Sequence, residues 1–176
     1  MTGERAPLAG PGGKTVLVHL VVNVEHWRFD AAMPRKVIPA PHGAEQLPDV
    51  PNFAWAEYGM RRGLPRLLAM IGERGLAAST SINAGAIAAY PSAAEAMLAA
   101  GWEFIGHGIH QRAVSGEDDE AALIGEALGV LGDFTGKPAR GWLGPGLRET
   151  AETPDHLKAA GIEYVGDWVL DDLPCW

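Results

Sequence analysis

The sequence predicts an α/β fold in which parallel strands alternate with helices. Three observations support this fold class. Short apolar segments are rich in β-branched residues, amphipathic segments of helical period lie between them, and glycines stand at the boundaries between the two kinds of segment. Such an alternation produces a parallel sheet or barrel with right-handed crossovers. The chain has 176 residues, 47% of them hydrophobic, which suffices for one domain with a core.

The expected strands begin with residues 15–24 (TVLVHLVVNV), a nearly continuous apolar run typical of a strand that is covered on both faces. Four more strands are expected at residues 76–82, 102–106, 141–143 and 162–166. A closed barrel typically needs about eight strands. We therefore expect a parallel β/α fold that is truncated after about five strands, preceded by a flexible tail at residues 1–13.

The expected helices lie between these strands, at residues 65–74, 92–100, 117–131 and 153–160. In the second of them, Ser92 and Glu95 have the spacing of a capping box. Residues 30–52 are different, because five prolines in this segment prevent regular structure. A loop of that length in a compact domain is usually a lid or a binding loop, so we expect it to cover the mouth of a pocket.

Composition excludes several classes of function. Net charge is −8, and an acidic surface repels phosphate backbones, so we expect no nucleic-acid partner. No apolar run is long enough to span a bilayer, and the first 13 residues lack the apolar centre of a signal peptide. The single cysteine, Cys175, excludes an internal disulfide. We expect a cytoplasmic protein without a membrane partner.

Polar side chains follow the first expected strand. Asn23 and Glu25 stand two residues apart, so they point to the same side, and His26 and Trp27 follow at once. In parallel α/β folds, functional groups gather at the carboxyl ends of strands. These residues are therefore candidates for catalysis and substrate binding. The alternative is a polar strand end that meets solvent.

Two histidines follow the third expected strand. His107 and His110 would face one ion if the segment turned helically, and neutral imidazole suits zinc and similar divalent metals. Glu25 would complete the set, because the ends of parallel strands converge. The sequence thus predicts a divalent metal, zinc first, held by Glu25, His107 and His110. The alternative is one histidine bonded in the core and one exposed.

The last two expected strands also end in candidate residues. Trp142 belongs to a glycine-rich turn that would form a pocket wall or an ordinary loop. Asp167 and Asp171 belong to an acidic segment that would orient a histidine, bind substrate or simply be solvated.

The order of these motifs resembles the polysaccharide deacetylase family, also called the NodB-homology family, and within it the allantoinase-like branch. The resemblance runs from about residue 16 to the C-terminus and rests on these motifs: Asn23-Val24-Glu25, Tyr58-Gly59 with Arg61, His107-Gly108, Pro138-Ala139-Arg140-Gly141-Trp142 and Asp167-Trp168 with the residues up to Trp176. It implies a distorted parallel β/α barrel of NodB-homology type, of which 14–176 is a partial domain.

The resemblance also implies roles and departures. By position Asn23 matches the general base of metal-dependent members, and a carboxamide accepts no proton at neutral pH, so His26 or an aspartate such as Asp167 would act instead. Glu25 matches a metal ligand and His107 the first histidine of an i, i+4 pair, whose second place is held by Gln111. The allantoinase-like branch departs similarly and includes members expected to need no metal.

The resulting prediction is a hydrolase of carbon–nitrogen bonds other than peptide bonds. Its substrate would be a carbohydrate or small molecule carrying an N-acetyl group or a ureide ring, with Glu25, His26 and Asp167 catalytic and Asn23, Trp27, Trp142 and Asp171 in contact with substrate. The alternatives are a non-catalytic binding module and an inactive fragment of such an enzyme. The uncovered apolar C-terminal residues predict self-association into a homo-oligomer.

Overall fold

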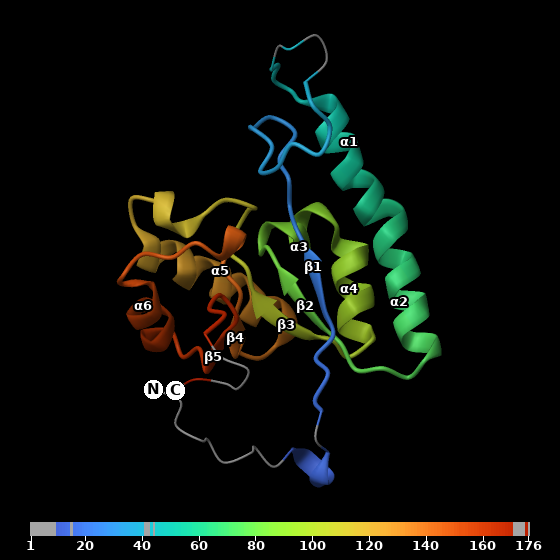
Figure 1. The fold of residues 1–176 in the computed structure, drawn as a ribbon, viewed down its shortest axis with the longest axis vertical. Helices are drawn as coiled ribbons and strands as arrows, with labels where there is room; N and C mark the ends of the chain where they lie inside the picture. The colour runs from blue at the N-terminus through green and yellow to red at the C-terminus, as the bar shows by residue number, and fades with distance from the viewer. Residues whose placement is uncertain (1–9, 15, 41–42, 44, 171–174, 176) are drawn as a thin grey trace.

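The strands form one parallel sheet in sequential order. The computed structural model describes residues 10–14, 16–40, 43, 45–170 and 175. Within them the order is β1-β2-β3-β4-β5, and each neighbouring pair is parallel. The strands are β1 (Val21–Val24), β2 (Ser79–Ile82), β3 (Glu103–Gly106), β4 (Gly141–Trp142) and β5 (Tyr164–Val165). All five carboxyl ends therefore lie along one edge, as expected from the sequence (Figure 1).

Helices connect the strands and cover the sheet (Figure 1). They are α1 (Val50–Tyr58), α2 (Leu64–Glu73), α3 (Gly85–Ala89), α4 (Pro91–Ala99), α5 (Glu120–Thr135) and α6 (Thr153–Ala159). Short turns complete the described elements: η1 (Pro11–Gly13), η3 (Gly59–Gly63), η4 (Val114–Gly116) and η5 (Pro145–Leu147). The π-helical η3 keeps helical backbone angles at both ends, so α1, η3 and α2 run on as one long rod. No helix among the described residues is long and apolar enough to cross a membrane.

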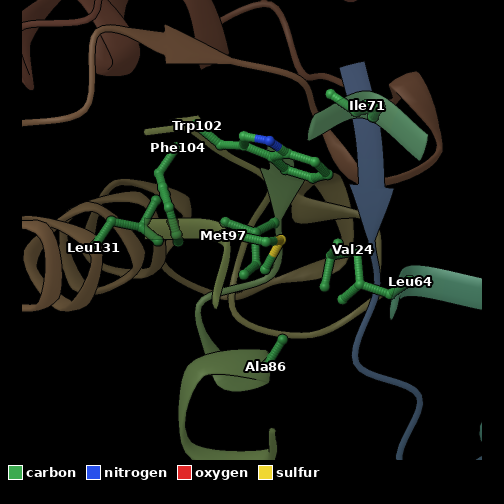
Figure 2. Packing of buried hydrophobic residues seen from close by; sticks show 9 residues of the cluster. Val24, Leu64, Ile71, Ala86, Met97, Trp102, Phe104 and Leu131 are labelled. Carbon is green, nitrogen blue, oxygen red and sulfur yellow. The ribbon is translucent and has the colours of Figure 1, made fainter. Parts of the chain in front are cut away.

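The core is divided into two clusters. The larger one packs Val24, Ile82 and Phe104 of the strands against α2, α4 and α5, with Met97 fully buried at its centre (Figure 2). The second cluster lies around Trp142, which is 0% exposed, between α5 and α6. Gly106 allows this packing, because a Cβ there would lie 2.6 Å from the Trp142 ring. Large apolar contact areas of this kind hold the helices on the sheet.

The first strand is shorter than the sequence predicts. The apolar run from Val16 to Val18 is 70–84% exposed, and no ladder pairing begins before Val21. The reason is that the neighbouring strand, β2, begins at Ser79, so the residues before Val21 have no strand beside them. Residues 1–9 of the expected tail lie outside the described residues.

Two helix starts also differ from the prediction. The helix at α4 begins with Pro91 at its first turn, and Tyr90 is the capping residue, so Ser92 and Glu95 form no capping box. Proline suits this position because the first turn needs no N–H donor. Helix α5 begins at Glu120 rather than at residue 117, since the Asp119 side chain accepts from Ala122 N at 2.9 Å.

The described residues of the proline-rich segment before Val50 form no α-helix or strand, and α1 begins at Val50, inside the predicted loop. Asn52, on that helix, holds the loop in place by hydrogen bonds. Its Oδ1 accepts from Val37 N and Ile38 N at 2.8 Å each, and its Nδ2 donates to Ile38 O at 3.0 Å. Asn52 is 2% exposed, so these bonds are shielded from water.

Candidate functional site

Glu25 stands just beyond the carboxyl end of β1, half-buried. Its Oε2 accepts a hydrogen bond from Trp27 Nε1 at 2.7 Å, which the i, i+2 spacing allows. Asn23 precedes it on the same side of the strand. All three residues line a pocket of about 780 Å³. The structure thus brings together three of the four residues that the sequence predicted at the end of the first strand.

Asn83, just after β2, ties the ends of β1 and β3 together. Its Oδ1 accepts from His26 N at 2.8 Å, and its Nδ2 donates to the carbonyl oxygen of His107. The side chain is 0% exposed. The backbone around Glu25 and the backbone at His107 are therefore fixed relative to each other by one buried carboxamide.

His107 is 2% exposed and held in one orientation. Its Nδ1 donates to the carbonyl oxygen of Leu143, which can only accept, so the proton of the neutral ring is on Nδ1. Its Nε2 is buried and has no well-formed hydrogen bond among the described residues. Burial lowers the pKa of His107, and this outweighs the bond to Leu143, the charge of Glu25 and the side chain of Gln111, each of which raises it. The ring is therefore neutral near pH 7.

Gln111, not His110, reaches this cluster. Gly108 has φ of 68°, the left-handed region, so the chain bends after His107 instead of making a helical turn. His107 and His110 therefore do not share a face. His110 turns to the other side, where its Nδ1 lies 3.1 Å from His26 Nδ1. Gln111 lies on the pocket wall, and its Oε1 is buried without a well-formed partner among the described residues.

The pocket lies between the end of β1, the proline-rich loop and the long helical rod. Its polar wall includes Arg35, Arg112 and Arg148 as well as Glu25 and Gln111. Its other lining residues are mostly apolar: Val22, Val24, Pro34, Val37, Trp55, Ala56, Gly59, Met60, Gly63, Leu64, Leu67, Ala113, Pro145 and Gly146. Aromatic and apolar walls with a few convergent polar groups are typical of small-molecule sites. The loop contributes Pro34, Arg35 and Val37, which agrees with its expected place at the mouth.

Other predicted residues lie elsewhere. Trp142 is fully buried in the second core cluster, because its side chain points to the helices, and it cannot touch a substrate. His26 follows Glu25 but points to the opposite side, into the pair with His110 and edge-on to Tyr90. Asp167 accepts from Gly144 N at 2.6 Å. Asp171 lies outside the described residues.

The donor set does not fit the predicted zinc site. Within the described part of the chain, no three His, Cys, Asp or Glu side chains are placed to hold a metal ion. Glu25 and His107 do interact, but the third neighbour is the carboxamide of Gln111, and zinc sites use thiolate, imidazole and carboxylate. His110, the third predicted ligand, is paired with His26 instead.

Asn83 was missed as a site residue by the sequence argument. The sequence did contain a signal for it. Asn83 is a polar residue directly after the second strand, just as Asn23 and Glu25 are polar residues at the end of the first strand. Gln111 was noted only as a departure from a histidine pattern. Its place beside His107 follows from the backbone angle of Gly108, which composition and spacing do not reveal.

Comparison with known proteins supports the fold. No protein-family model matches the sequence, and no curated protein does. Among solved structures, the chain is similar to the Puue allantoinase, with a TM-score of 0.83 and 25% identity over 99% of this chain and 61% of that one. It is also similar to a probable polysaccharide deacetylase from Pseudomonas aeruginosa PAO1, with a TM-score of 0.75 and 26% identity over 90% of this chain and 56% of that one.

A third similar structure is a CE4 family pseudoenzyme from Bacillus anthracis, with a TM-score of 0.50 and 13% identity over 58% of this chain and 37% of that one. The predicted resemblance to polysaccharide deacetylases and allantoinase is therefore confirmed at the level of the fold, which is the NodB-type parallel α/β fold. The chain spans about three fifths of the length of the allantoinase structure.

Proposed function

We propose that the pocket beside Glu25 hydrolyses a carbon–nitrogen bond in a linear or cyclic amide, either an N-acetyl group or a ureide ring. The observation that carries this proposal is the cluster of Glu25, His107 and Gln111: Glu25 and Gln111 line the pocket, and both raise the pKa of the buried His107 imidazole. Support comes from the fold, which is that of structures described as an allantoinase and a probable polysaccharide deacetylase.

Glu25 is the general base in this proposal. Its carboxylate takes a proton from water while the water oxygen attacks the carbonyl carbon of the substrate. The carbon–nitrogen bond then breaks and the proton passes from Glu25 to the leaving nitrogen. An N-acetyl group gives acetic acid and an amine, whereas a ureide ring opens to one product that carries a carboxylic acid and a urea group. The carboxamide of Asn23, on the same side of β1, donates an N–H to the oxygen that becomes negative.

His107 supports the base by remaining neutral. A positive ring beside Glu25 would stabilise the carboxylate and make it a weaker base. Burial lowers the pKa of His107, so this charge does not form near pH 7. Because the donor set does not fit zinc, we assign activation of the water to the Glu25 carboxylate and not to an ion.

A second candidate function is binding without catalysis. The observation that favours it is Asn23, which stands where the resembled family has its usual base, together with a fold shared with a pseudoenzyme. In that case Trp27 and Trp55 would hold a carbohydrate or small molecule by stacking, and no bond would break. The related possibility is an inactive part of a longer hydrolase.

A substrate panel separates these functions. Purified protein is incubated with N-acetylated sugars and with cyclic ureides, and amine release and ring opening are followed alongside binding by calorimetry. Turnover of one class, linear in protein concentration, supports hydrolysis. Saturable binding to a member of the panel without turnover over days supports the binding module and contradicts the proposed hydrolase.

A further inference from the structure

One peptide group lies between His107 and Asp167. His107 Nδ1 donates to the carbonyl oxygen of Leu143, and the N–H of Gly144 donates to Asp167 Oδ1 at 2.6 Å. The carbonyl of Leu143 and the N–H of Gly144 belong to the same planar peptide unit. The imidazole and the carboxylate therefore act on opposite ends of one resonant group, and each bond strengthens the other by polarisation.

The approach of Asp167 requires the glycine. A Cβ at position 144 would lie 2.4 Å from Asp167 Oδ2 and 3.4 Å from Trp142 Nε1. Gly144 has φ of −66° and ψ of 143°, angles that any residue adopts. Glycine is therefore needed at 144 for space and not for backbone freedom. The close contact between the carboxylate and this peptide is a specific feature of the site.

The far side of Asp167 meets a second acid. Asp167 Oδ2 and Glu149 Oε1 are both buried without a hydrogen-bond partner among the described residues, and Trp168 Nε1 holds the other Glu149 oxygen at 2.8 Å. Burial, and then the neighbouring Glu149 side chain, raise the pKa of Asp167 to about 7. A buried carboxyl beside a second acid takes up a proton more readily than an exposed one, and in Asp167 the oxygen on the side of Glu149 is Oδ2. Oδ1 stays free to accept from Gly144.

We propose that Asp167 is a positioning residue for His107, and that it fixes the tautomer and the orientation of the imidazole through the Leu143–Gly144 peptide. Asp167 anchors the peptide, the peptide carbonyl takes the Nδ1 proton, and Nε2 is left as a lone pair on the side of Glu25 and Gln111. Asp167 is not among the residues that line the pocket beside Glu25. Its consequence for hydrolysis rests on the proposed function, whereas the tautomer itself does not.

The test is the tautomer of His107, read by long-range proton–nitrogen correlation on histidine-labelled protein at pH 7.5. The signals are assigned with His107→Gln. The protein has six histidines, so the spectrum is simple. In the unaltered protein we expect Nδ1 protonated and Nε2 bare. Asp167→Ala should lose the single Nδ1–H pattern and show a mixture, and Asp167→Asn, which keeps an acceptor oxygen, should restore it.

Two further variants keep the proposal open to refutation. Asp133→Ala, an exposed acid on α5, is the matched control and should leave the His107 signals unchanged. Should Asp167→Ala not fold, Glu149→Gln answers the same question: it removes the neighbouring acid that raises the pKa of Asp167, so Asp167 carries more negative charge and the Nδ1-bound proton of His107 should shift downfield. A folded Asp167→Ala protein with an unaltered Nδ1–H pattern, or a Glu149→Gln protein without that shift, would overturn the proposal.

Because the readout is spectroscopic, its failure is distinct from failure of the hydrolase proposal. If Asp167→Ala loses the single Nδ1–H pattern of His107 but no substrate is turned over, the positioning role stands and only the proposed reaction is contradicted. Where turnover is found, Asp167→Ala should lower kcat more than it raises KM, since the residue acts on His107 and not on substrate. An equal kcat in Asp167→Ala would contradict the inference.

Discussion

Two histidine clusters lie at the same edge of the sheet, and they differ in burial and in hydrogen bonding. His107 is buried, bonded on Nδ1 to a carbonyl and next to Glu25 and Gln111. His26 and His110 are half-buried and meet Nδ1 to Nδ1 at 3.1 Å. His26 is the sequence neighbour of Glu25, yet it points the other way. The side to which a residue points decides its role more than its place in the chain.

The two clusters also differ in how they hold protons. The tautomer of His107 is set by an acceptor that never titrates. In the pair, one ring must donate and the other accept, so at least one is neutral. Burial first, and then the charge of its partner, lower the pKa of His26, while burial and then the charge of Arg28 lower that of His110. We therefore treat the pair as a contact between loop ends and the His107 cluster as the site.

The largest expected effect concerns the residue that joins the two clusters. Asn83→Ala leaves His26 N–H and the His107 carbonyl without their buried partner. At about 1–3 kcal/mol for each of the two buried groups left without a partner, the free energy of unfolding should fall by about 2–6 kcal/mol. Urea unfolding measures it, with Asn23→Ala as the exposed control, expected within about 0.5 kcal/mol. Equal losses in both variants would contradict this account of Asn83.

The next effect concerns metal. Gln111→His supplies an imidazole beside Glu25 and His107, so it should create the zinc set that the unaltered donors do not form. In known metal sites, loss of a residue that only orients a ligand lowers metal affinity by up to roughly 100-fold. Gain of a direct ligand should raise zinc affinity by more than this. Calorimetry with zinc measures it, and His110→Gln tests whether the other cluster contributes. Tight zinc binding by the unaltered protein that disappears in His110→Gln would show that His110 is a zinc ligand, which contradicts the conclusion that the donor set does not fit zinc.

Acid should destabilise the fold through His107. Its pKa is lowered from the usual value of about 6.5, so the unfolded chain takes up this proton first. Stability is thus fully present above pH 6.5 and is lost as pH falls from there towards the folded pKa, by at most about 1.4 kcal/mol per pH unit for one group. Glu25 and Gln111 are the side chains that oppose this shift.

Urea unfolding at several pH values between 7.5 and 5.5 measures the loss of unfolding free energy. Turnover should fall over the same pH range. His107→Gln should flatten the stability profile, provided it melts cooperatively. His26 and His110 have lowered pKa values too, so His110→Gln serves as the comparison. A profile flattened only by His110→Gln would assign the acid response to the pair.

The smallest expected effect on kinetics is at the mouth of the pocket. Asn52→Ala removes the bonds that clasp the proline-rich loop to α1. A net hydrogen-bond contribution of about 1 kcal/mol corresponds to a rise in KM of about 5-fold, with kcat nearly unchanged. Steady-state kinetics on the substrate found in the panel measure it. A fall in kcat at constant KM would place the loop in the chemistry and not at the entrance.

The sequence predicted the fold class and the convergence at the strand ends, because both follow from alternation of strands and helices. The same logic placed Asn23, Glu25 and Trp27 together, and it would have placed Asn83. It failed for His110, because Gly108 adopts a left-handed angle that replaces the expected helical turn. Local geometry at one glycine therefore changed which side chain joins His107.

Two other misses have different causes. Trp142 was expected in the pocket, but β4 is only two residues long and its inside–outside assignment is set by pairing with β3 and β5, which the residues themselves do not reveal. Val16–Val18 were expected in a strand, since a pattern shows the preference of a segment and not whether a partner strand lies beside it.

The most direct test of the central claim compares two neighbours in the sequence. Glu25→Gln and His26→Gln are measured on the best substrate of the panel, at saturating concentration and in protein that melts cooperatively. We predict that Glu25→Gln lowers kcat by about 10²–10⁴-fold, as expected for loss of a general base, and that His26→Gln stays within about 3-fold. A large loss in His26→Gln with Glu25→Gln near full activity would show that the reaction belongs to the other histidine cluster.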